Sequence, residues 1–216
     1  MHSFTEENYL KAIYHLLMRT SNATTNDIAA AIGTKAASVT DMLKKLADKK
    51  LINYARYQGV TLTEQGRQVA LAIVRKHRLW EYFLVKKLNF RWDEVHDMAE
   101  ELEHISSTEL INRLDSFMGC PQFDPHGDPI PDADGQISVQ QLQQATSMAV
   151  DQSGVITAVA DHTASFLQYL EKNNLMIGNT ITVTDTTDYD VSVLVKENDQ
   201  KINISHEVAK HILIAI

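Results

Sequence analysis

The residues best suited to chemistry in this 216-residue chain are histidines and glutamates spaced as metal ligands. His77 and Glu81 stand four residues apart, which places an imidazole and a carboxylate on one face of a helix. A second helix, predicted from Glu94 to about Ile105, carries four more such residues at spacings of four, three and one: His96, Glu100, Glu103 and His104. Oxygen and imidazole donors without a thiolate suit Mn²⁺, Fe²⁺, Co²⁺ or Zn²⁺, and a carboxylate-rich set favours Mn²⁺.

Each of these residues alone has a structural explanation, because a single helical histidine usually packs or is solvated and a glutamate-rich helix usually faces water. Two helices that both carry His and Glu at ligand spacing are harder to explain in this way. Carboxylates gathered on one face repel each other unless a cation or a proton compensates them. The spacing therefore predicts a metal-binding function.

The net charge of −8 is distributed unevenly along the chain. Residues 1–80 contain 12 Lys and Arg against 6 Asp and Glu, whereas residues 81–216 contain 8 against 22. The basic N-terminal part indicates a nucleic-acid partner. No apolar run approaches the roughly 18 residues of a membrane span. The N-terminus does not resemble a signal peptide, and the single cysteine, Cys120, allows no internal disulfide, so we expect a cytoplasmic protein without a membrane partner.

The first eighty residues predict a winged helix-turn-helix. A first helix begins at Thr5, a short second helix runs from Thr25 to Gly33, and a third covers residues 36–50 with an apolar stripe on one side. Two short strands, 51–54 and 60–62, then form the wing, and Thr63 caps another long helix. This order of elements is typical of a DNA-binding domain.

The second helix of such a motif enters the major groove, so its polar residues and the wing are candidates for DNA contact. The candidates are Lys35, Ala37, Ser38, Thr40, Lys44, Lys45 and Arg56. The alternative is that the lysines only form a solvated helix face. We favour DNA contact because these lysines occur within an order of elements that is typical of a DNA-binding domain.

The chain resembles the metal-dependent repressors of the diphtheria-toxin-repressor family, and within it the manganese-transport-regulator branch most closely. The resemblance covers nearly the whole chain. It is carried by an N-terminal winged helix followed by His77-Arg78-Leu79-Trp80-Glu81, Val95-His96-Asp97 and Glu100-x-x-Glu103-His104.

The resemblance implies two metal sites. Glu100, Glu103 and His104 match a primary site, which Asn8 of the first helix and Asp124 of the linker complete. The ancillary site matches His77, Glu81 and His96, with Asp161 of the C-terminal part as a further ligand. Glu100 stands where iron-type members carry a thiol, which favours manganese. Asn8 stands where manganese members often have an aspartate.

The fold class expected is mainly α with a small β part. We predict a winged-helix DNA-binding domain over 1–75 and a helical metal-binding and dimerisation domain over 76–137, ending in a linker that holds all four prolines. Segments 154–159, 180–183, 191–195 and 201–204 alternate as strands around one short helix. They indicate an SH3-like barrel of five strands over 138–216, as in the longer family members.

We therefore expect a repressor that Mn²⁺ activates and that binds double-stranded operator DNA as a homodimer to control metal-uptake genes. No small organic substrate and no enzymatic activity are expected. Two alternatives stay open. One is an Fe²⁺-sensing repressor of the same family, and the other is a metal-dependent hydrolase in which the held ion activates water. The hydrolase would leave the winged helix without a role.

Overall fold

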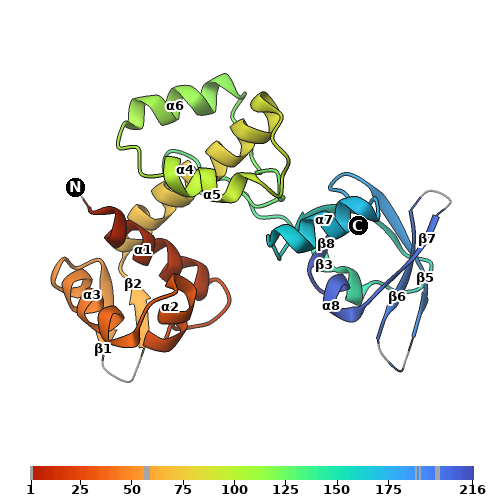
Figure 1. The fold of residues 1–216 in the computed structure, drawn as a ribbon, viewed down its shortest axis with the longest axis horizontal. Coiled ribbons are helices and arrows are strands. Elements are labelled where there is room, and N and C mark those ends of the chain that lie inside the picture. Colours follow the sequence, from red (N-terminus) through yellow and green to blue (C-terminus); the bar gives the residue numbers. More distant parts are fainter. Residues whose placement is uncertain (1, 56–58, 188, 190, 198–199) are drawn as a thin grey trace. The chain divides into compact units, whose positions relative to one another are not determined.

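The structure is a computed structural model that describes residues 2–55, 59–187, 189, 191–197 and 200–216 (Figure 1). The chain forms two compact units. The first comprises Met1–His77, Glu100–Leu114 and Pro131–Gln136, and the second Arg78–Ala99, Asp115–Ile130 and Ile137–Ile216. The division falls inside three helices: α4 (Glu64–Leu88), α5 (Val95–Leu102) and α6 (Thr108–Phe117).

The first unit contains the predicted winged helix. Its elements are α1 (Phe4–Leu17), α2 (Thr25–Ile32), α3 (Ala36–Asp48), β1 (Ile52–Ala55) and β2 (Gly59–Leu62). The strands pair antiparallel, with Ile52 opposite Leu62. Fully buried side chains from all three helices fill the core between them: Leu10, Ile13, Ile28, Val39, Leu43 and Leu46. The winged-helix prediction is confirmed.

The helix starts are set by capping boxes close to the predicted positions. Ser3 caps α1 by accepting from the Glu6 N–H, and Glu6 accepts in return from the Ser3 N–H. Thr24 and Asp27 form the same arrangement at α2. The predicted caps, Thr5 and Thr25, were therefore wrong by two residues and one residue. In both cases a neighbouring hydroxyl has the acidic residue three positions later that a capping box requires.

The long helix α4 begins as predicted after Thr63, whose Oγ1 accepts from the Gly66 N–H at 3.1 Å. The next helix, α5, ends at Leu102 and is shorter than predicted. Glu103 and His104 consequently lie in the turn that follows α5.

The second unit contains a six-stranded antiparallel sheet in the order β3-β8-β4-β5-β6-β7 (Figure 1). Its elements are β3 (Gln143–Gln144), the 3₁₀ helix η1 (Ala145–Ser147), β4 (Ser153–Val159), α7 (Ala164–Lys172), β5 (Thr180–Thr186), β6 (Val193–Glu197), β7 (Gln200–Ile204), α8 (His206–Ala209) and β8 (Ile212–Ala215). The predicted count of five strands was too low. The strand β8 was not predicted, although it pairs with both β3 and β4.

Within the described residues, the structure has no helix of the length and apolarity needed to cross a membrane.

Candidate metal centre

Three buried side chains of the second unit converge on one point. They are Glu81 on α4 and Asp124 and His126 in the loop after α6, and they are only 2, 7 and 1 % exposed. One ligand atom from each lies within 4.8 Å of the others. We call these three residues the His126 cluster. It offers two carboxylates and one imidazole, which is a donor set for a hard or borderline divalent cation.

Contacts at both ring nitrogens and on one ring face fix the orientation of the His126 side chain. Its Nε2 lies 2.8 Å from the Trp92 carbonyl oxygen, which can only accept, so Nε2 carries the proton and donates. Its Nδ1 is buried without a hydrogen-bond partner and lies 3.6 Å from Glu81 Oε2. The ring stacks on His162 at 4.6 Å between centroids. A histidine held through one nitrogen by a carbonyl, with the other nitrogen directed at carboxylates, has the arrangement of a metal ligand.

The loop that carries Asp124 and His126 is closed by its own hydrogen bonds. Asp124 Oδ1 accepts from the N–H groups of His126 at 2.8 Å and Asp128 at 3.0 Å. Gly127 has φ +87°, and a Cβ atom there would lie 2.2 Å from the Thr157 carbonyl oxygen. A glycine is therefore required at this position both for its conformation and for the approach of β4.

We expect Gly127→Ala to lower the free energy of unfolding by roughly 2–4 kcal/mol, because it combines left-handed strain with a backbone clash. The matched control is Gly178→Ala. Gly178 has φ +95°, but nothing lies within 4 Å of the added Cβ. This substitution therefore tests the backbone strain alone, and we expect it to lower the free energy of unfolding by about 1 kcal/mol. Chemical denaturation of the metal-free proteins measures both values. Equal losses for the two variants would show that the contact with β4 is unimportant.

Burial and neighbouring charges set the protonation of the cluster. Burial, with the charges of Asp128 and Glu81, raises the pKa of Asp124 to about 7. Burial lowers the pKa of His126, but the nearby carboxylates of Glu81 and Asp124 outweigh it and raise the pKa to about 9. Arg78 limits the repulsion, since its guanidinium lies 3.7 Å from Asp124 and 2.8 Å from Asp128. Without a metal ion, protons are the compensating cations of this cluster.

These pKa values predict how metal binding depends on pH. Both folded-state pKa values lie above the ordinary values of 6.5 for His126 and 3.8 for Asp124, so each group stabilises the metal-free fold at low pH and loses that contribution as pH rises through the folded value. A cation needs both groups deprotonated. We expect affinity to rise roughly tenfold per pH unit between 7 and 9, and more steeply below 7.

Calorimetric titration with Mn²⁺ at about pH 6.5, 7.5 and 8.5, in buffers of different ionisation enthalpy, measures the protons released. An affinity that does not change with pH would exclude the His126 cluster as the binding site.

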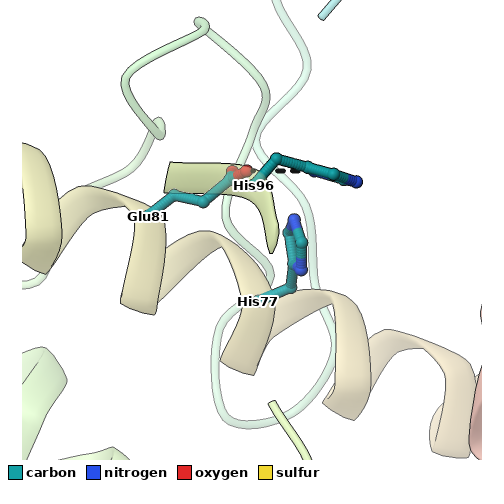
Figure 2. Close-up of side chains that lie close together, drawn as sticks. All are labelled: His77, Glu81 and His96. Atoms are coloured by element: carbon teal, nitrogen blue, oxygen red, sulfur yellow. Dashed lines mark ion pairs between the residues drawn. The ribbon is translucent and has the colours of Figure 1, made fainter. Parts of the chain in front are cut away.

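Three of the four predicted ancillary residues, His77, Glu81 and His96, are drawn in Figure 2. His77 and Glu81 project from successive turns of α4, and one ligand atom from each lies within 4.8 Å of one from His96. Glu81 Oε1 lies 3.5 Å from His96 Nδ1, while its Oε2 faces His126. Asp161, predicted to complete this set, accepts instead from the Thr163 N–H at 2.9 Å. Glu81 is thus common to both candidate groups.

The predicted primary residues lie in the first unit. Glu103 is fully buried, and its Oε2 lies 2.7 Å from His77 Nδ1. Glu100 and Glu103 both pair with the ammonium of Lys11, and we call these four residues the Glu103 cluster. His104 Nδ1 lies 2.8 Å from Glu7 Oε2.

Asn8 and Asp124 were the further predicted ligands of this site. The Asn8 side-chain oxygen is buried without a hydrogen-bond partner, which suits a cation ligand. Asp124 shares its candidate group with Glu81 and His126.

Two residues of these clusters were not predicted. His126 stands two positions after Asp124 in Asp124-Pro125-His126-Gly127, so its proximity to a predicted ligand was the available signal. Lys11 has no comparable signal, because a lysine on an amphipathic helix is usually solvated.

Six of the seven predicted DNA-contacting residues are described, and these six lie along α3 or at its N-terminus. All but Thr40 are exposed, and the Thr40 hydroxyl donates to the Ala36 carbonyl at 3.0 Å. The exposed ones are Lys35, Ala37, Ser38, Lys44 and Lys45. The wing residue Arg56 lies outside the described residues. DNA contact by these side chains stays a prediction.

Comparison with known proteins agrees with this arrangement. Residues 1–60 match the family described as the iron-dependent repressor N-terminal DNA-binding domain, residues 63–132 its metal-binding and dimerisation domain, and residues 144–216 the FeoA domain. A solved manganese-dependent transcriptional repressor in complex with manganese is 34% identical over 97% of this chain and 98% of its own, with a TM-score of 0.89. The manganese regulator SloR is 31% identical over 97% of both chains, with a TM-score of 0.78. The iron-dependent repressor IdeR of Mycobacterium tuberculosis is 26% identical over 95% of this chain and 94% of its own length.

A winged helix joined to helices with His and Glu clusters and to a small β domain defines a metal-dependent transcriptional repressor. The chain belongs to the diphtheria-toxin-repressor family, in the branch of the manganese regulators.

Proposed function

We propose that the protein represses metal-uptake genes when Mn²⁺ binds, as a cytoplasmic homodimer on double-stranded operator DNA. The observation that supports this proposal best is the His126 cluster. It combines two buried carboxylates with an imidazole nitrogen that has no hydrogen-bond partner. Oxygen-rich sites without sulfur favour Mn²⁺ over softer ions. Fe²⁺ is the alternative ion, since imidazole and carboxylate also suit it.

In this proposal, Glu81, Asp124 and His126 hold the ion, with Glu81 also paired to His96. The bound ion supplies two positive charges in place of the protons that compensate the cluster. The Trp92 carbonyl keeps the His126 Nδ1 directed at Glu81, and Arg78 keeps Asp128 and the loop in place. Glu100, Glu103 and His104, with Asn8 on α1, form a second ion-binding position, and Asp161 is a further candidate ligand of the ancillary set.

The connection to DNA runs through the chain itself. The helix α4 starts directly after the wing strand β2 and carries Glu81 further along. Residues 1–75 contact DNA, 76–137 bind metal and dimerise, and 138–216 adjust the response. In a dimer, two α3 helices bind the major groove one helical turn apart, roughly 34 Å on B-DNA. Metal binding selects the conformation in which that spacing is met.

Fluorescence anisotropy with DNA from upstream of the protein's own gene, at fixed salt, tests this proposal. Mn²⁺, Fe²⁺ under anaerobic conditions and Zn²⁺ are titrated in turn, with a chelator control. We expect binding to appear with Mn²⁺ at the lowest concentration and to disappear with chelator. Binding that is independent of metal would exclude the sensing function but keep DNA binding. Absence of binding to any DNA would favour the hydrolase alternative.

A further inference from the structure

Lys11 lies among the residues of the predicted primary metal site. Its Nζ is 2.6 Å from Glu100 Oε1 and 2.7 Å from a Glu103 carboxylate oxygen. The Lys11 and Glu103 side chains are 11 % and 0 % exposed. His77 Nδ1 lies 2.7 Å from Glu103 Oε2, an oxygen that also accepts from Lys11 Nζ. This lysine is therefore a buried ion-pair partner and not a solvated surface cation.

The position that the ammonium takes is also a candidate cation position. One ligand atom each from His77, Glu100 and Glu103 lies within 4.8 Å of the others. The ammonium contacts two of these three residues. A divalent ion held by the same oxygens would lie next to a buried positive charge, and like charges repel strongly in a site of low dielectric.

The helix α1 brings Lys11 to this position together with two other residues. Glu7 and Lys11 are four residues apart and share one face, and Glu7 pairs with His104 at 2.8 Å. Asn8 lies on the same helix and has a buried side-chain oxygen without a partner. The ammonium thus joins α1 to the acidic end of α5 by charge pairing that needs no metal ion.

We propose that Lys11 is a tethered cation of the Glu103 cluster, which occupies the carboxylates of Glu100 and Glu103 until a divalent ion displaces it. This inference rests on the proposed function only in that a divalent ion reaches the cluster. The lysine stabilises the metal-free protein and lowers the affinity of the cluster for metal. Metal binding to the cluster is then an exchange of the Lys11 ammonium for a divalent ion. It therefore needs a higher metal concentration than binding to the same carboxylates without the lysine.

Lys11→Met tests the proposal, because it keeps much of the side-chain volume and removes the charge. We expect the metal-free variant to have a Tm about 5 °C or more below wild type, since two buried carboxylates lose their cation. Mn²⁺ chloride should restore the Tm. The affinity for Mn²⁺, measured by calorimetry, should be at least about tenfold tighter than in wild type. Both measurements are repeated with His126→Ala present, so that uptake at the Glu103 cluster is measured by itself.

Two variants serve as controls, and Lys11→Gln replaces the methionine variant if that does not fold. Lys11→Arg keeps the charge and should behave as wild type. Lys49→Met removes the lysine 2.6 Å from buried Glu6, which belongs to none of the candidate metal groups among the described residues, and should leave Mn²⁺ affinity unchanged.

Wild-type or weaker Mn²⁺ affinity in Lys11→Met, or an arginine variant that behaves like the methionine variant, would overturn the proposal. Tighter uptake by Lys11→Met in a protein whose wild type shows no metal-dependent DNA binding would support this role of Lys11 and overturn the proposed function instead.

Discussion

Replacement of His126 by alanine is expected to lower the Mn²⁺ affinity of the protein by about 100-fold and to shift metal-activated DNA binding to correspondingly higher Mn²⁺ concentrations. The imidazole is the single nitrogen donor of the His126 cluster, and its Nδ1 is the buried atom without a hydrogen-bond partner. Without it, Glu81 and Asp124 retain two carboxylates but lose the ligand that fixes their spacing. Calorimetry with Mn²⁺ and anisotropy with operator DNA measure the two effects.

The matched control is His206→Ala, since His206 lies on the short helix α8 and belongs to none of the candidate metal groups among the described residues. This variant should keep the affinity and the DNA response of wild type. Unchanged metal activation in His126→Ala would show that the His126 cluster has only a structural role.

Replacement of Glu103 by alanine is expected to lower the free energy of unfolding of the metal-free protein by about 3–5 kcal/mol. Glu103 is fully buried, and its removal leaves Lys11 and His77 without the carboxylate that they share. Urea denaturation followed by circular dichroism measures the loss. The same variant should need more Mn²⁺ for DNA binding, since the carboxylate is also a predicted ligand.

Glu101→Ala provides the comparison, because Glu101 is an exposed glutamate two residues earlier. Its effect on stability should be within about 0.5 kcal/mol. Equal stability of the two variants would mean that the buried pairing of Glu103 contributes no net stability.

The sequence was sufficient for those parts of the fold that local signals determine. Hydroxyl and acidic residues marked the starts of α1 and α2 to within two residues, and Gly33 marked the end of α2 with φ +70°. Apolar periodicity identified α3 and its buried face. The strand β8 was missed because Ile212–Ile216 is one apolar run, in which alternation between two faces is not visible. Its place between β3 and β4 depends on pairing with distant residues.

For the candidate ligands too, the sequence predicted local neighbours but not contacts between distant residues. Sequence spacing placed His77 with Glu81 and Glu100 with Glu103, and both pairs lie close together in the structure, although Glu103 follows the end of α5. The spacing carries no information on the Trp92 carbonyl that orients His126, or on the ammonium that Lys11 brings to Glu103, since these contacts span 34 and 92 residues. Buried charge partners from distant elements are set by tertiary packing and not by local pattern.

The proposed function requires that Mn²⁺ binds among Glu81, Asp124 and His126. Anomalous diffraction from crystals grown with Mn²⁺, recorded on both sides of the manganese absorption edge, tests it most directly. We predict an anomalous peak in contact with His126 Nδ1 and with oxygens of Glu81 and Asp124. Manganese peaks elsewhere in the protein, with none at these three residues, would contradict it.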